Sequence, residues 1–138
     1  MANRQGGKPN RKAVNSLATP LAPEDNNTAT PVFCLGFIQP SCDVKRLPES
    51  QQADFAVALQ DKARFTWKEL TLNRKHSHGV ATLPRRAIKK QIPERFSDED
   101  RFHVLRYTGN NRAMVGVRAG KVFHILWIEK TFGDVYDH

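Results

Sequence analysis

The chain has 138 residues and a formal net charge of +8, and 39% of its residues are hydrophobic. This length supports one modest hydrophobic core but no second domain of ordinary size, and the charge favours nucleic acid, an anionic membrane surface or an acidic protein as a partner. No stretch approaches the roughly 18 apolar residues of a membrane helix, and residues 2–30 lack the apolar segment of a secretory signal, so we expect a cytoplasmic protein without a membrane span.

Residues 1–31 predict a disordered, basic N-terminal arm. They contain Gly, Pro, Asn, Thr and Ala with almost no large apolar side chains, and this composition cannot offset the entropy lost on folding. The arm could tether nucleic acid non-specifically, or it could be an unselected tail. We therefore expect a single folded domain over residues 32–138.

The first half of this domain predicts a strand and two helices. Residues 32–38 form a short apolar run between two prolines, which favours a strand. A helix is expected after Ser50, and Thr66 and Glu69 have the spacing of a capping box that begins a second, short helix. The apolar face of the first helix is expected to consist of Ala53, Ala56, Val57, Leu59 and Ala63, and Phe55 and Phe65 could extend it.

The second half predicts a small antiparallel sheet. Residues 83–93 alternate between basic and apolar side chains, which is consistent with one more short helix that ends at Pro93. Residues 102–138 contain three β-strands with turns at 109–111 and 119–120, where Gly and Asn permit positive φ. The expected fold is α+β: a strand, two or three helices and then a three-stranded antiparallel meander.

The second turn also predicts which side chains share a face. If Arg118 lies opposite Lys121, Arg112 and Trp127 lie on one face, while the other face is the better core. A three-residue loop would reverse this assignment. On the expected register, the Arg112 guanidinium can contact a phosphate while Trp127 stacks on a base.

The densest basic segment lies between residues 74 and 95. A cluster of this kind gives salt-dependent affinity for nucleic acid, although a solvated helix face is an equally good interpretation. The cluster contains one acid, Glu94, and seven basic residues: Arg74, Lys75, Arg85, Arg86, Lys89, Lys90 and Arg95.

We expect no metal, no cofactor and no disulfide. The two histidines of this segment, His76 and His78, have no Cys or carboxylate beside them to complete a zinc site. Cys34 and Cys42 fit neither a zinc pattern nor a disulfide framework, so we expect two reduced thiols.

Three residues could together cleave a phosphodiester. Without a metal, this reaction needs a base, an acid and a fixed cation. His138 can act as acid or base, Tyr136 can donate a proton, and Arg112 can stabilise the charge on phosphorus, helped by Arg106 and Lys90. The alternative is that Tyr136 packs in the core and His138 frays.

The order of elements resembles the RelE/ParE toxin superfamily, most of all its HigB-like and YoeB-like ribonuclease branches. The resemblance covers residues 32–138 and rests on four segments: 105–107, 111–116, 122–127 and Val135-Tyr136-Asp137-His138. It implies a basic α+β protein that cuts mRNA, usually on the ribosome, and is silenced by an acidic antitoxin protein.

Carried over by position, the resemblance implies a catalytic set of Arg112, Tyr136 and His138. The segment 73–100 is longer than is usual in the family, and Asp137 separates the tyrosine from the histidine. The residues expected to contact RNA are Arg85, Arg86, Lys89, Lys90, Arg106 and Trp127.

Two other functions remain open from the sequence. One is a non-catalytic nucleic-acid-binding or phage-type regulatory module that uses the basic segment as its contact surface. The other is a member of the same superfamily that inhibits a protein target such as gyrase.

Overall fold

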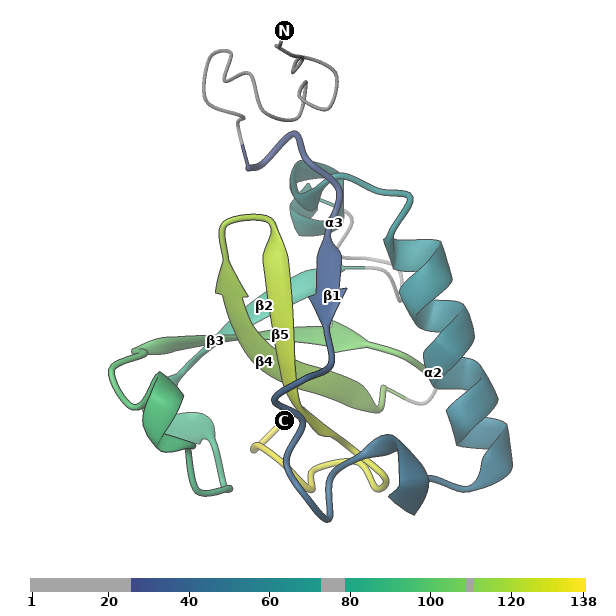
Figure 1. Ribbon diagram of the computed structural model, residues 1–138, viewed down its shortest axis with the longest axis vertical. Coiled ribbons are helices and arrows are strands. Elements are labelled where there is room, and N and C mark those ends of the chain that lie inside the picture. Colours follow the sequence, from purple (N-terminus) through teal and green to yellow (C-terminus); the bar gives the residue numbers. More distant parts are fainter. Residues whose placement is uncertain (1–25, 73–78, 109–110) are drawn as a thin grey trace, which may run out of the picture.

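The computed structural model describes residues 26–72, 79–108 and 111–138 (Figure 1). Most of the predicted arm, together with Arg74, Lys75, His76 and His78, therefore lies outside the described residues. The described residues form β1 (Val32–Cys34), α2 (Glu49–Lys62), α3 (Trp67–Leu72), β2 (Val80–Pro84), β3 (Arg101–Arg106), β4 (Ala113–Ala119) and β5 (Val122–Ile128). Short 3₁₀ turns are found at Val44–Arg46, Arg85–Ala87 and Glu94–Phe96.

The five strands form one mixed sheet in the order β1-β5-β4-β3-β2. β1 is parallel to β5, and every other neighbouring pair is antiparallel. The predicted α+β class is confirmed. The predicted helix over residues 83–93 is wrong, because its beginning belongs to strand β2 and only Arg85–Ala87 makes a single 3₁₀ turn. The meander therefore has four strands instead of three.

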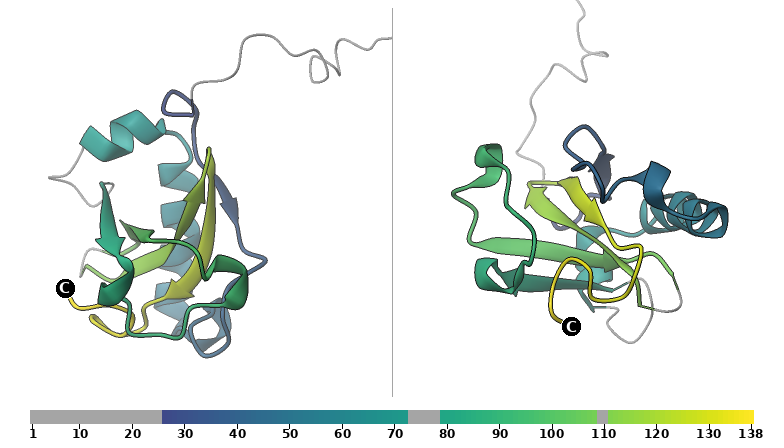
Figure 2. Two further views of the ribbon diagram at one scale, coloured as in Figure 1. Left: turned by 90° about the vertical axis from the view of Figure 1, so that its left-hand side faces the viewer. Right: turned by 90° about the horizontal axis from the view of Figure 1, so that it is seen from below.

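Both faces of the sheet are covered. The helices α2 and α3 pack on one face, where a core forms around Phe55, Trp67 and Leu70 (Figure 2). The other face is covered by the 3₁₀ segment at Phe96 and by the C-terminal residues Val135 and Tyr136. A sheet buried on both faces accounts for the nearly continuous apolar sequences of β4 and β5.

The buried face of α2 includes Phe55, the predicted extension of the apolar face, but otherwise differs from the prediction. Phe55, Ala58 and Lys62 are buried, whereas Val57 is 55% exposed. The apolar positions of this helix are mostly alanines, which give little indication of direction, and a single phenylalanine outweighs several of them in buried area. In the part of the chain that is described, no helix is both long and apolar enough to cross a membrane.

Residues 26–31 belong to the folded domain, contrary to the predicted boundary at residue 32. The Trp67 and Lys68 backbone N–H groups donate to the carbonyl oxygens of Ala29 and Asn27 at 3.0 and 2.9 Å, and Ala29 is buried. Arg118 donates to the Asn27 side chain at 3.0 Å and lies 4.3 Å from the Trp67 ring. These contacts satisfy backbone donors at the start of α3, which also has the predicted capping box.

Both the turn between β4 and β5 and a β-bulge in β5 change the predicted register. Arg118 pairs with Phe123 instead of Lys121, and the pairing then slips by one residue between Gly116 and Val115, so that Val115 lies opposite Trp127. At Gly116 the two backbones approach closely, because an added Cβ would lie 1.9 Å from the His124 carbonyl oxygen. The slip moves Trp127 and every later residue to the opposite face from the one the unbroken alternation predicts.

Candidate active site

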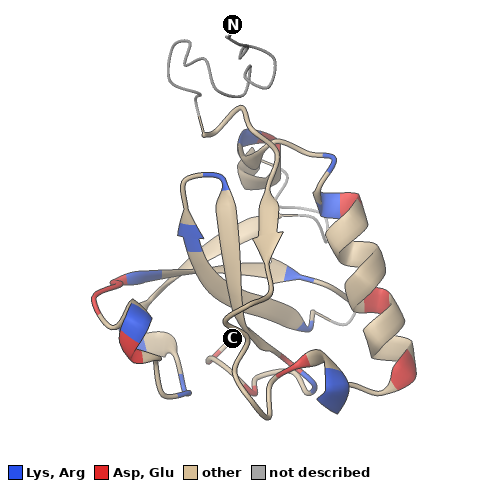
Figure 3. Cartoon of the chain, in the orientation of Figure 1, with Lys and Arg blue, Asp and Glu red and all other residues tan. Residues whose placement is uncertain are grey.

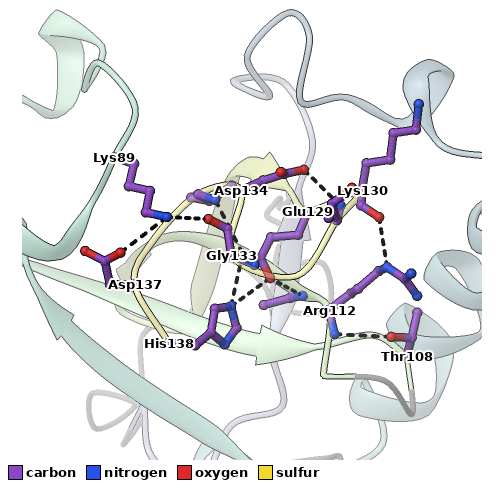
Figure 4. A network of polar contacts seen from close by, with 12 residues as sticks. Lys89, Thr108, Arg112, Glu129, Lys130, Gly133, Asp134, Asp137 and His138 are labelled. Carbon is purple, nitrogen blue, oxygen red and sulfur yellow. Dashed lines mark hydrogen bonds and ion pairs between the residues drawn. The ribbon is translucent and has the colours of Figure 1, made fainter.

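A buried carboxylate organises the C-terminal end of the chain (Figure 4). Glu129 directly follows β5 and is fully buried. Its side chain accepts hydrogen bonds from the backbone N–H groups of Ala113 at 3.1 Å, Gly133 at 3.1 Å and Val135 at 3.4 Å. These bonds tie residues 133–135 to the start of β4, so the last residues fold back onto the sheet.

The same carboxylate holds the imidazole of His138. The Nε2 atom lies 3.1 Å from both carboxylate oxygens of Glu129. The ring stacks on Tyr136 at 4.0 Å and contacts Phe132 at 3.7 Å between centroids, and the side chain is only 10% exposed. His138 is thus ordered, contrary to the alternative that it frays. In neutral His138 a proton on Nε2 suits the carboxylate and leaves the lone pair on Nδ1.

Tyr136 is 5% exposed and is held by the loop that follows β2. It forms an isolated antiparallel bridge with Ile88, and the Lys89 N–H donates to the Val135 carbonyl at 2.7 Å. The Lys89 side chain adds a 2.8 Å hydrogen bond to the Gly133 carbonyl and a 3.2 Å ion pair with Asp137. Burial raises the pKa of Tyr136 to about 12, so its hydroxyl stays protonated near neutral pH.

Arg112 is not brought together with Tyr136 and His138. Its Nε atom donates to the Lys130 carbonyl at 2.8 Å, and its guanidinium points away from His138 in Figure 4. Its charge acts instead on Tyr107, whose pKa burial raises to about 12 while Arg112 opposes that rise. Tyr107 belongs to the core on the helix side of the sheet, whereas Tyr136 belongs to the core on the other side.

Arg106 is the arginine that lies on the face of Tyr136. Strand alternation places it with Phe102 and Val104, whose side chains share a core with Tyr136. Its positive charge opposes the burial effect on the pKa of Tyr136. The predicted RNA-contacting residue Arg106 therefore lies on the face of the sheet where we expected Arg112.

Trp127 cannot stack on a nucleic-acid base, which corrects the expectation for this residue. It is 1% exposed and packs against Phe102 with 5.9 Å between ring centroids. The bulge before it places the ring in the core that contains Tyr136 and not in the core on the helix side of the sheet. The exposed aromatic beside His138 is Phe132, of which 50% is exposed.

The predicted basic contacts lie on the segment that follows β2. Arg85, Arg86 and Lys89 are exposed and Lys90 is partly buried, but they do not share a helix face because no helix forms there. Arg85 is held by the carbonyl oxygens of Ser97 and Glu99. Figure 3 shows Lys and Arg residues in this segment and at the ends of β3 and β4.

Sequence reasoning missed Glu129 and Phe132. The only local signal for Glu129 is an acidic residue directly after the long apolar run of β5, and such a residue more often marks the point where a strand reaches solvent. Among the described residues, no group of three or more His, Cys, Asp or Glu side chains could hold a metal ion.

Comparisons of the chain with protein-family models, curated proteins and solved structures found no match.

Proposed function

We propose that this protein is a toxin-type endoribonuclease that cuts ribosome-bound mRNA without a metal and is neutralised by a cognate acidic antitoxin. The observation that carries the proposal is the Glu129–His138 pair, in which a fully buried carboxylate holds an imidazole at 3.1 Å. Carboxylate-imidazole pairs that fix one tautomer are common where histidine acts as a base. The net charge of +8 supports a polyanionic substrate.

In the proposed reaction the Nδ1 atom of His138 removes the proton of the RNA 2′-hydroxyl, and the resulting oxyanion attacks the adjacent phosphorus. The bond from phosphorus to the 5′-oxygen then breaks, and the leaving oxygen takes a proton from a water molecule or from the imidazolium. Tyr136 acts as a neutral hydrogen-bond donor, since a pKa of about 12 excludes it as a base near neutral pH. Arg106 replaces Arg112 as the cation that faces the RNA backbone, and it holds the phosphate next to the one that is cut.

Phe132 is assigned the contact with an RNA base. It is half exposed and lies against the imidazole, so a base stacked on it would place its ribose beside His138. The ring of Phe132 also covers His138, which means that it must shift when RNA binds. This replaces the role that was expected for Trp127.

The RelE-like fold is part of the same proposal. The order β1, α2, α3 followed by consecutive antiparallel strands supports it, and β2 is one strand more than the resemblance implies. The additional strand comes from the segment 73–100, which is longer than is usual in the family.

The test is an RNA cleavage assay with and without ribosomes, in the presence of a chelator. His138→Gln is expected to lower the cleavage rate by a factor of about 100 or more, the usual contribution of a general base. Asp137→Asn is the matched control, because this neighbouring side chain is 80% exposed and points to Lys89. Intact mRNA with the unchanged protein, or equal cleavage by His138→Gln, contradicts the proposal.

A second function is favoured by one observation. The His138 side chain is 10% exposed and Tyr136 is 5% exposed, which suits a structural role at the C-terminal end. In that case the protein binds nucleic acid without cutting it. Salt-dependent RNA binding with no new RNA ends, and with equal affinity for His138→Gln, selects this alternative.

A further inference from the structure

We propose that the hollow between strand β2 and Arg106 is a binding site for a phosphate oxyanion. Under the proposed function, on which this part of the inference rests, the occupant is a phosphate of single-stranded RNA next to the one that is cut. The hollow has a volume of about 280 Å³ and is lined by Gly79, Val80, Ala81, Thr82 and Arg106. It differs from the Glu129–His138 pair in residues and in the strands that form it.

Arg106 supplies a buried donor, its Nε atom, that has no acceptor among the described residues. A buried donor on a cation is costly unless an acceptor reaches it, and none of the described residues that line the hollow is acidic. A bound anion would satisfy this donor and balance the charge.

The backbone of β2 supplies a second set of donors. Among the strands of residues 26–72, 79–108 and 111–138, β2 lies at the edge of the sheet and pairs only with β3, so none of them neighbours its outer edge. Alternate residues of an edge strand direct their N–H groups outward, so one of the two neighbouring exposed residues Ala81 and Thr82 has an outward N–H. Outward N–H groups beside a guanidinium are a donor set that suits an oxyanion.

The size of the hollow favours a small group. Ligand pockets for drug-sized molecules usually exceed about 300 Å³ and are mainly apolar. The hollow beside Arg106 is slightly smaller, and one charged residue and one strand edge form its walls. The charge and the strand edge fit an oxyanion better than an apolar ligand.

The position of the hollow connects it with the candidate active site. Arg106 shares its face of the sheet with Tyr136, and the charge of Arg106 acts on the Tyr136 hydroxyl. A phosphate held by Arg106 would therefore lie on the same side of the sheet as His138. It would fix the direction in which an RNA strand crosses the site.

The test is a titration of the isotopically labelled protein with inorganic phosphate, and separately with a DNA dinucleotide that has no 2′-hydroxyl and cannot be cut. Backbone amide NMR signals of residues 79–82 are expected to shift. Arg106→Gln should weaken binding by about tenfold, which corresponds to the loss of one charge-assisted hydrogen bond. Arg101→Gln is the matched control, since it removes the same charge from the other end of β3, where the side chain is exposed.

The outcomes separate this site from the proposed function. A loss of affinity in Arg106→Gln alone, with normal binding by His138→Gln, supports the site whether or not the protein cuts RNA. Shifts spread over the basic residues generally, or equal weakening by Arg101→Gln, overturn it. Stronger binding of the dinucleotide than of inorganic phosphate identifies nucleic acid as the source of the phosphate, and equal binding identifies the free anion.

Discussion

Replacing Glu129 with alanine removes the acceptor that holds the C-terminal residues on the sheet. Two backbone N–H groups, those of Ala113 and Gly133, each lose a 3.1 Å hydrogen bond, while the 3.4 Å contact from Val135 is too long to count fully. A buried donor left without an acceptor costs about 1–3 kcal/mol, so two of them predict a loss of about 4 kcal/mol in the free energy of unfolding.

The loss is measured by urea unfolding of Glu129→Ala beside two comparison variants. Glu129→Gln keeps one carbonyl oxygen but turns an amide group toward N–H donors, so we expect about half of the loss. Asp134→Ala is the matched control: its carboxylate accepts a 2.9 Å hydrogen bond from the Thr131 N–H at an exposed position. We expect this control to cost less than about 1 kcal/mol.

Amide hydrogen exchange shows which part of the structure is destabilised in Glu129→Ala. The N–H groups of Gly133 and Lys89, which are bonded to Glu129 and to the Val135 carbonyl, should lose protection first in Glu129→Ala. Equal stability of Glu129→Ala and Asp134→Ala, with both amides still protected, would show that Glu129 does not hold these residues on the sheet.

Four further predictions concern the sheet, the pH dependence in two ranges and the N-terminal boundary. Gly116→Ala should lower the free energy of unfolding by about 3 kcal/mol in the same urea assay, because its Cβ would lie 1.9 Å from a backbone oxygen. Gly36→Ala is the control and should cost little, because its Cβ would lie 3.8 Å from the nearest side chain. Burial lowers the pKa of Lys62 from 10.5 to about 8, so between these pH values the unfolded chain binds more protons than the folded one. The free energy of unfolding should therefore rise with pH across that range by at most about 3 kcal/mol. The variant Lys62→Met should abolish this rise. Burial raises the pKa of Tyr107 and Tyr136 from 10.0 to about 12, so stability should fall as pH increases from 10.0 through 12. Truncation to residue 32 should cost about 2 kcal/mol more than truncation to residue 26, because two N–H groups at the start of α3 lose their backbone acceptors; equal melting temperatures for the two truncations contradict this.

The sequence predicted those features that depend on interactions between residues close together in the chain. The capping box at Thr66 and the turn residue Gly120 were readable because each acts within a few residues. The strand Val80–Pro84 was missed because a proline and nearby basic residues resemble a helix start, and only its pairing with β3 makes it a strand. The docking of residues 26–31 was also missed, since it depends on Arg118, about ninety residues away.

The candidate site could be predicted only in part, and the reason is one extra residue in β5. Unbroken alternation after Phe123 and Ile125 would put position 129 on the helix side of the sheet, away from Tyr136. The bulge reverses this, so that Glu129 lies beside Ala113 on the face that the C-terminal residues cover. The absence of a side chain at Gly116 lets the bulged strand approach. The position of His138 therefore depends on Gly116 in strand β4. A substitution of this glycine should displace the imidazole as well as weaken the sheet.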